Sequence, residues 1–322
     1  ACYGRSLLPT VTDAHVVLGH FPGSALLGGD FKLDEGRARE ALDKLAREMS
    51  VAVARRVSAV QAAQGVLDVV NTNMERALRH ISVERGHDPR DFTLVPFGGA
   101  GGLHAVELAR ALRIPRVLLP SSPGALSAIG VVTANVVKDQ SRTVMLEATR
   151  GVEQKLARVF REMEEQARSA LRREGFSGSK QRHERSLAAR YKGQSFELQI
   201  KQTSGDLASA FHRVHRVRYG YAQEKNVVEI VSARVRSIGV VEKLKAARSR
   251  LARQSLAKPH DFTESYFEGK RIRAAVYQRQ ELPAGARLRV PCIVAEYSAT
   301  TLIPLGARVE VDGYRNLIIQ VK

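Results

Sequence analysis

The stretch FGGAGGLH at residues 97–104 decides the fold of this chain. It follows an apolar run at 92–96 and precedes a helix-like segment at 105–113. A strand that turns through glycines into a helix places backbone N–H groups at the helix N-terminus, where phosphate or another anion binds. Glycine is needed there because a Cβ atom would hold a ligand away from the backbone and forbid positive φ. The spacing is neither GxGxxG nor GxxxxGK[ST]. Two interpretations therefore stay open, an anion site and a tight turn used for packing.

The composition indicates a folded protein with a sizeable core. The chain has 322 residues, which is enough for two domains or one large one, and 44% of them are hydrophobic. Tryptophan is absent and aromatic residues make up only 6%. The core must therefore be built from Leu, Val, Ile and Ala.

The charge is strongly basic, with 51 Lys and Arg against 33 Asp and Glu and a net charge of +18. Between residues 151 and 260 basic residues are more than twice as frequent as acidic ones. Such a balance is typical of a polyanion-binding surface, of a solvated Arg-rich surface, or of a face that docks on an acidic partner chain. No basic motif interleaved with aromatic residues is present, so nucleic acid is not the partner we expect.

The two cysteines, Cys2 and Cys292, lie far apart and have no metal-ligand spacing. They do not indicate a disulfide framework, and a reducing cytoplasm is the expected location. No apolar run approaches membrane-spanning length and no signal peptide is visible, so no membrane partner is expected.

The order of predicted elements in the first half is that of an α/β layer fold. Helices are expected at 14–20, capped by Thr12 or Asp13, at 34–49, capped by Asp34, and at 57–85. A strand near Phe92, the glycine turn, a helix at 103–113, a strand at 116–119 and a helix at 125–135 follow. The later chain predicts a surface helix at 152–174, strands within 182–202, a helix at 206–218, a strand at 227–241, a basic linker or loose helix at 243–259, and a β-rich end from 271.

Six segments, in this order, together resemble the hydantoinase A / 5-oxoprolinase family, whose relatives include ATP-dependent acetone and acetophenone carboxylase subunits. They are TVTDA at 10–14, SVERGHDPRDF at 82–92, FGGAG with the histidine of 97–104, PG and SAIG within 123–130, YKGQS at 191–195, and FHRVH with YGY within 211–221.

The resemblance implies an α/β fold: a partial sugar-kinase/actin-like ATPase lobe, an α+β domain, and a small C-terminal β module. We place these parts at 1–147, at 148–245, and at 246–322 with the linker included. It also implies ATP and Mg²⁺ as cofactors, and a cyclic amide of the 5-oxoproline or hydantoin type as substrate. The carbonyl oxygen would be phosphorylated and the activated ring opened by water. A second large subunit of the hydantoinase B type, or a homo-oligomer, is the implied assembly.

Two departures from the family pattern limit what the chain is expected to do alone. The acidic-glycine phosphate motif, of the DxGGTxTD kind, is absent, and Gly102 stands where the family has proline. The chain is therefore expected to be a later portion of a family member, with an incomplete Mg-ATP site and no activity by itself. Two other functions stay open: a subunit of an ATP-dependent ketone carboxylase, and a non-catalytic assembly module.

The resemblance assigns two catalytic candidates and four cofactor-binding ones, and no metal ligand. Asp13 would place a metal, a water or the substrate, with a helix cap as the alternative, and His104 would contact substrate or phosphate, with a structural histidine as the alternative. Ser127 would bond to backbone or ligand. The expected cofactor-binding residues are Gly98, Gly99, Gly101 and Ser127.

Two further sets of polar residues are left with open roles. Asn71 lies inside a predicted helix, either exposed or facing a ligand cleft. His212 and His215 share a helix face at a spacing that a metal can use, but no third ligand accompanies them.

Overall fold

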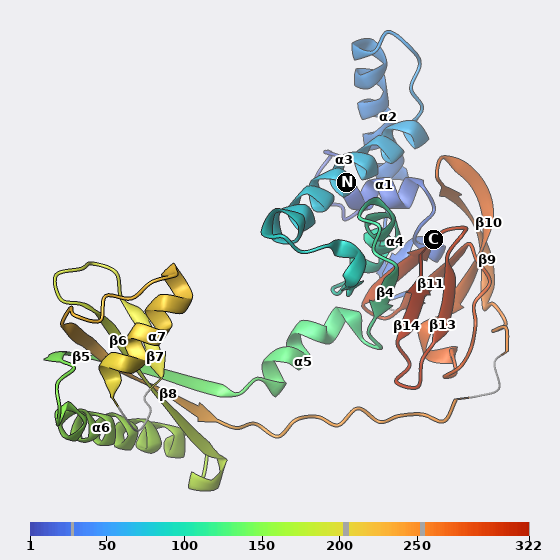
Figure 1. Cartoon of the computed structure of the whole chain (residues 1–322). Helices are drawn as coiled ribbons and strands as arrows, with labels where there is room; N and C mark the ends of the chain where they lie inside the picture. Colours follow the sequence, from blue (N-terminus) through green and yellow to red (C-terminus); the bar gives the residue numbers. More distant parts are fainter. Residues whose placement is uncertain (27–28, 202–205, 252–254, 322) are drawn as a thin grey trace. The chain divides into compact units, whose positions relative to one another are not determined.

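A computed structural model describes residues 1–26, 29–201, 206–251 and 255–321. The chain divides into two compact units, one formed by residues 1–131 together with 245–322 and the other by residues 132–244. Figure 1 labels most of the helices and strands of both units.

Three capped helices begin the first unit. Helix α1 (Val11–Val17) starts at a capping box, in which Thr10 accepts from the Asp13 N–H and the Asp13 carboxylate accepts from the Thr10 N–H. The helix therefore begins three residues before the expected position, with Thr10 as its cap. Helix α2 (Glu35–Ala52) is capped by Asp34, as predicted, and α3 (Ala59–Ile81) by Ser58.

The sheet behind the glycine turn joins distant parts of the sequence. Its strand order is β13-β14-β4-β3. Leu119 of β4 lies opposite Leu317 of β14, and both side chains are fully buried. The strands and the helix that follows the turn are β3 (Thr93–Leu94), α4 (Gly101–Ala111), β4 (Arg116–Leu119), β13 (Arg308–Val311) and β14 (Leu317–Gln320).

A second sheet of the same unit has the order β12-β11-β10-β9 and packs on α4 through β12. Its strands are β9 (Asp261–Phe267), β10 (Lys270–Gln278), β11 (Cys292–Glu296) and β12 (Ala299–Ile303). The short pair β1 (Ala25–Leu26) and β2 (Phe31–Lys32) also belongs to this unit, and the helix α5 (Leu126–Thr133) spans the division between the two units.

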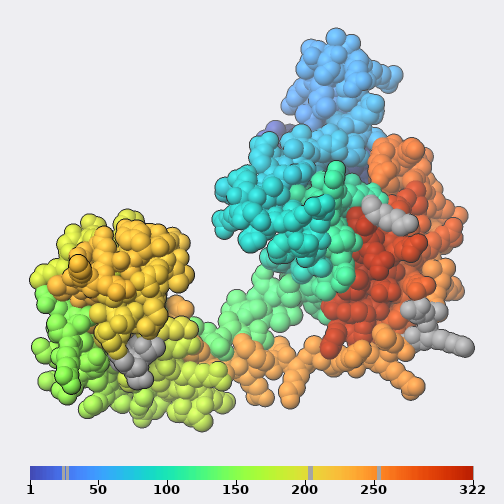
Figure 2. Space-filling model, viewed as in Figure 1, coloured from blue at the N-terminus to red at the C-terminus, as the bar shows by residue number. Residues whose placement is uncertain are grey.

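The C-terminal strands pack with the N-terminal residues because β14 adds directly to β4. One apolar core unites Val117 of β4 and Ala109 of α4 with Ile303 and Ile319 of the C-terminal strands. In Figure 2 the red C-terminal residues lie directly against the green residues of α4 and β4. The expected module at 246–322 thus contributes to the same compact unit as residues 1–131. Of the expected linker, residues 252–254 lie outside the described residues, and the rest has no helix.

The second unit is a four-stranded antiparallel sheet with the order β5-β8-β6-β7 and two helices. Helix α6 buries a stripe at helical spacing, including Leu156, Phe160 and Leu171. The elements are β5 (Val136–Glu147), α6 (Val152–Arg173), β6 (Gln181–Tyr191), β7 (Leu198–Lys201), α7 (Leu207–Tyr219) and β8 (Val228–Gly239).

The fold is mixed α/β with several sheets, which confirms the predicted class. Within the described ranges, no helix combines the length and apolar character needed to span a membrane.

Candidate functional site

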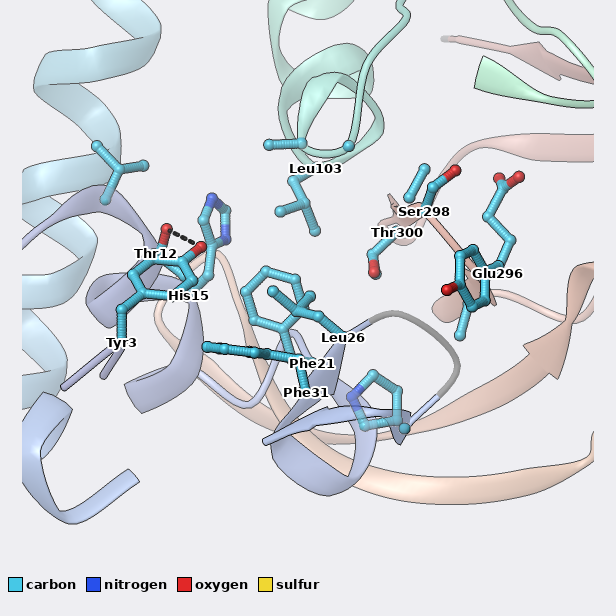
Figure 3. A pocket seen from close by; sticks show the side chains of 18 of the residues that line it. Tyr3, Thr12, His15, Phe21, Leu26, Phe31, Leu103, Glu296, Ser298 and Thr300 are labelled. Carbon is cyan, nitrogen blue, oxygen red and sulfur yellow. Dashed lines mark hydrogen bonds between the residues drawn. The ribbon is translucent and has the colours of Figure 1, made fainter. Parts of the chain in front are cut away.

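The first unit contains a cavity of about 1190 Å³. Its walls come from the N-terminal segment, the start of α1, the glycine turn and the β11–β12 hairpin. Figure 3 shows Phe21, Leu26 and Phe31 grouped on one side, and Glu296, Ser298 and Thr300 on another. The cavity thus has an apolar, aromatic wall and a polar wall. A cavity of this size and mixed lining suits a small organic ligand.

The first part of the glycine turn borders this cavity. Gly99 and Ala100 line it, and Ala100 is the N-cap residue of α4. Alanine has no side-chain acceptor, so no side chain caps the first turn of this helix. Gly98 has φ +83°, which favours glycine. An uncapped helix N-terminus beside a cavity can accept an anion.

The second part of the glycine turn serves packing. A Cβ atom on Gly102 would lie 2.6 Å from Thr301 Oγ1 and 2.8 Å from the Thr300 carbonyl oxygen. A Cβ atom on Gly124 would lie 2.7 Å from Ser298 Cβ. The Thr300 N–H donates to the Gly99 carbonyl at 3.1 Å. These glycines therefore form a notch that holds the β11–β12 hairpin against α4, which supports the packing interpretation, and the anion site stays a prediction.

We expect Gly102→Ala to destabilise the chain by about 1–3 kcal/mol, because the added methyl group meets backbone that cannot move away. Gly130→Ala is the matched control, since Gly130 also lies in a helix and a Cβ atom there has nothing within 4 Å. This control should be neutral or stabilising by up to about 1 kcal/mol. Urea denaturation of both variants measures the difference. Equal stability of the two would contradict the notch.

Asp13 is fully buried and its hydrogen bonds are all made within the chain. Its carboxylate accepts from the backbone N–H and hydroxyl of Thr10 and from the Cys2 N–H at 2.6 Å. Burial raises the pKa of this carboxyl, and these hydrogen bonds lower it. The side chain fixes the segment 1–13, of which Ala1 and Thr10 line the cavity. Its catalytic role stays a prediction.

His104 belongs to a buried row of three neighbouring histidines. Its Nε2 lies 3.4 Å from His15 Nε2, and its Nδ1 lies 2.8 Å from Asn71 Oδ1. His15 Nδ1 lies 2.7 Å from His20 Nδ1, and His20 Nε2 donates to the Tyr266 carbonyl at 2.8 Å. Asn71, the polar residue inside a helix, thus has a partner.

The two outer partners of these histidines, the Tyr266 carbonyl and the Asn71 Oδ1 atom, are both acceptors. Three neutral rings carry three N–H protons for four contacts, so one contact has no proton, and we assign this to the longest, the 3.4 Å contact between His15 and His104. Burial lowers the pKa of all three rings, that of His20 to about 4. His15 also lines the cavity.

The remaining candidates are only partly brought together. Gly99 lines the cavity, whereas Gly98 and Gly101 flank the lining residues Gly99 and Ala100. Ser127 lies exposed on α5 and is not among the lining residues. The cofactor-binding roles of all four stay predictions.

The polar wall includes a residue that the sequence did not single out, Glu296 at the end of β11. Its Oε1 is buried and has no hydrogen-bond partner among the described residues. Burial raises the pKa of this carboxyl to about 7, and Arg279 opposes the shift only in part. An acid in a β-rich segment has no sequence signal of its own, because its burial depends on a fold that closes over it.

The two histidines of α7 have structural contacts. His212 Nδ1 bonds to the Tyr191 hydroxyl at 2.9 Å, and His215 Nδ1 donates to the Tyr221 carbonyl at 2.7 Å. In the part of the chain that the structure describes, no group of three or more His, Cys, Asp or Glu side chains is placed to hold a metal ion.

Family models match nearly the whole chain. The hydantoinase/oxoprolinase model covers residues 1–140, and the hydantoinase/oxoprolinase C-terminal domain model covers residues 145–321.

Individual relatives extend this similarity. An uncharacterized protein of Methanocaldococcus jannaschii, MJ0964, is 35% identical, covering 99% of this chain and 46% of that protein. The caprolactamase subunit alpha of Pseudomonas jessenii is 30% identical, covering 97% of this chain and 46% of that protein. The chain thus spans about half the length of these curated relatives.

Two solved structures share the fold. A nucleotide-free acetone carboxylase superposes with a TM-score of 0.86 at 20% identity, covering 100% of this chain and 48% of that one. An ATP-dependent caprolactamase from Pseudomonas jessenii superposes with a TM-score of 0.70 at 28% identity, covering 99% of this chain and 48% of that one.

Proposed function

Because the chain belongs to the hydantoinase/oxoprolinase family, we propose that it is a portion of an ATP-dependent amidohydrolase that opens a cyclic amide of the 5-oxoproline or hydantoin type. The caprolactamase relative, which is named for another cyclic amide, supports the substrate class. The observation that carries the proposal is the cavity bordered by Gly99 and by the uncapped N-terminus of α4.

Chemistry explains why such an enzyme would use ATP. An unstrained amide carbonyl is a poor electrophile, and phosphorylation of its oxygen supplies a leaving group. One water would add to the activated carbon and the ring C–N bond would break, so that the nitrogen takes up a proton and leaves as an amine while an acyl phosphate remains. A second water would then displace the phosphate and leave the free acid. The negative charge on the transferring group must be balanced by backbone N–H groups and cations.

The residues of the turn fit a phosphate group. The first N–H groups of α4 would bind its oxygens. A Cβ atom on Gly99 would lie 3.1 Å from the Ser298 carbonyl oxygen, so glycine at this position lets the hairpin approach the turn. We propose that Gly98 and Gly101 shape this turn and that Ser127 contacts the nucleotide. Asp13 and His104 would act as positioning residues, since their polar atoms are engaged by neighbouring groups.

Mg²⁺ does not have an evident protein site here. The described residues hold no cluster suited to a metal, and we derive no step through the ion. For the assembly, we propose a second large subunit or a further copy of this chain, since the caprolactamase relative is named as one subunit.

The test is an assay of the full-length protein with ATP and, separately, 5-oxoproline, hydantoin, or acetone with bicarbonate. We expect ADP release that depends on a cyclic amide and yields the ring-opened acid. Nucleotide hydrolysis that depends only on the ketone and bicarbonate would replace this proposal with a carboxylase. No nucleotide hydrolysis under any condition would favour an assembly module.

A further inference from the structure

The polar wall of the cavity presents one carboxyl group on a rigid support. Glu296 ends β11 and pairs with Ala299 across the turn to β12. The hairpin is fixed by the hydrogen bond from Thr300 to Gly99 and by the notch at Gly102 and Gly124. A side chain on such an element is well positioned to recognise a ligand.

This carboxyl group has no hydrogen-bonded partner in the described part of the chain. Its Oε1 is buried and unpartnered. Arg279, the cation that acts on it, donates from Nη2 to the carbonyl oxygens of Leu119, Pro120 and Arg315 at 3.3, 3.0 and 2.9 Å. A buried polar atom without a partner costs free energy, so a ligand that pairs with the carboxyl is favoured.

Of the charged groups nearby, Arg279 also has a buried nitrogen, Nη1, without a hydrogen-bond partner among the described residues. Arg315 and Asp312 act on Arg279 with opposite signs. His260 and Glu281, which also line the cavity, lie 3.3 Å apart as a pair with half-exposed side chains. Burial therefore decides the protonation of Glu296, and its pKa of about 7 leaves the neutral acid abundant near neutral pH.

We propose that Glu296, as the neutral acid, binds the edge of a ring on which an N–H donor lies beside an acceptor. A carboxylic acid has an O–H donor and a carbonyl acceptor side by side, and it forms two hydrogen bonds with such an edge. A cyclic amide is held cis and presents its N–H and C=O together. The amino-pyrimidine edge of adenine presents the same pattern. This inference rests on the proposed function for the choice of these two ligands.

The opposite wall supports a ring-shaped ligand. Phe21, Leu26 and Phe31 lie across the cavity from the hairpin and offer apolar surface to a ring face (Figure 3). Apolar walls with a few polar groups at one edge orient a ligand and give specificity.

The experiment measures binding by calorimetry in the full-length protein at pH 6, 7 and 8. The probes are 5-oxoproline, 1,3-dimethylhydantoin with hydantoin as its parent, and ADP. The variants are Glu296→Gln and Glu296→Leu, with Glu281→Gln as the control on the same cavity. Thermal melting confirms that each variant is folded.

For the ligand that Glu296 recognises, we expect wild-type affinity to fall roughly tenfold from pH 6 to pH 8, as the neutral acid is lost. Glu296→Gln should bind that ligand with little dependence on pH, because the amide also offers a donor beside an acceptor. Glu296→Leu should bind it weakly at every pH, and Glu281→Gln should behave as wild type. The ligand whose affinity changes with pH, cyclic amide or ADP, identifies the ring that Glu296 binds. Methylation of the ring nitrogens should remove the pH dependence seen with hydantoin.

The proposal is overturned if neither ligand shows a pH dependence that Glu296→Gln abolishes, or if Glu296→Leu binds both as wild type does. If a Glu296 variant does not fold, the pH dependence of ligand binding to the wild type and to the Glu281→Gln control still tests the proposal. Failure of the proposed function looks different: no cyclic amide would stimulate ATP hydrolysis, while binding of one ligand could still depend on Glu296.

Discussion

Replacing Ala100 with aspartate is expected to raise the ATP concentration for half-maximal activity of the full-length protein by roughly a hundredfold, because like charges placed together cost several kcal/mol. Ala100 is the N-cap of α4 and lines the cavity. A carboxylate there would occupy the position that we assign to a nucleotide phosphate, and it would repel the negative charge. The fold should not suffer, because aspartate is favoured at a helix N-cap.

Asparagine at the same position is the matched control. It has nearly the same size and the same preference for an N-cap, but it carries no charge. Ala100→Asn should therefore change the ATP requirement much less than Ala100→Asp. If the two variants respond alike, shape and not charge matters at this position. If neither responds, phosphate does not lie at the N-terminus of α4.

Replacing Glu296 with glutamine is expected to leave stability nearly unchanged at pH 4 and to raise it by about 3 kcal/mol at pH 8. Burial raises the pKa of Glu296 from 4.5 to about 7. Between these values the folded state binds more protons than the unfolded state, so the stability of the wild type falls as pH rises. Glutamine has no proton to lose and escapes this penalty.

Urea denaturation of both proteins at pH 4, 6 and 8 measures the difference. Glu281→Gln is the control, since its parent side chain is 53% exposed and surface substitutions change stability within about 0.5 kcal/mol. A difference between wild type and Glu296→Gln that stays constant with pH would contradict the burial of this acid.

The local elements were predictable because each has a local cause. Asp34 is followed by an amphipathic run, and the helix begins there as expected. The strand at 116–119 lies between a helix with apolar periodicity and a Pro-Ser turn, and its observed bounds are the same. The start of α1 was misplaced because the chain offers Thr10, Thr12 and Asp13 as caps, and Thr10 and Asp13 act together as a capping box.

Local patterns could not predict which segments of the chain come together in the first unit. The pairing of Leu317 with Leu119 joins residues about two hundred positions apart, and neither strand carries a signal that names its partner. The same holds for the cavity, whose polar wall comes from a hairpin far along the chain. The glycine turn was recognised as a candidate site, but the packing role of Gly102 depends on the hairpin that fills the notch.

The surroundings of His104 were predictable only in part. Its place at the start of a helix after the glycine turn was evident, and so was the odd position of Asn71 inside a helix. The sequence could not show that these two side chains meet, or that His15 and His20 extend the row of histidines. Both contacts depend on how α1, α3 and α4 pack.

Hydrogen–deuterium exchange of the full-length protein, with and without a non-hydrolysable ATP analogue and Mg²⁺, tests the central claim most directly. We predict that the nucleotide slows exchange of the backbone amides at residues 99–102, because a bound phosphate would accept their N–H groups, whereas the N–H groups of Gly98 and Leu103 already donate to the Pro123 and Ala100 carbonyls. Exchange within residues 132–244 should change little. Unchanged exchange at 99–102 in the presence of bound nucleotide would contradict the claim that this turn holds the phosphates.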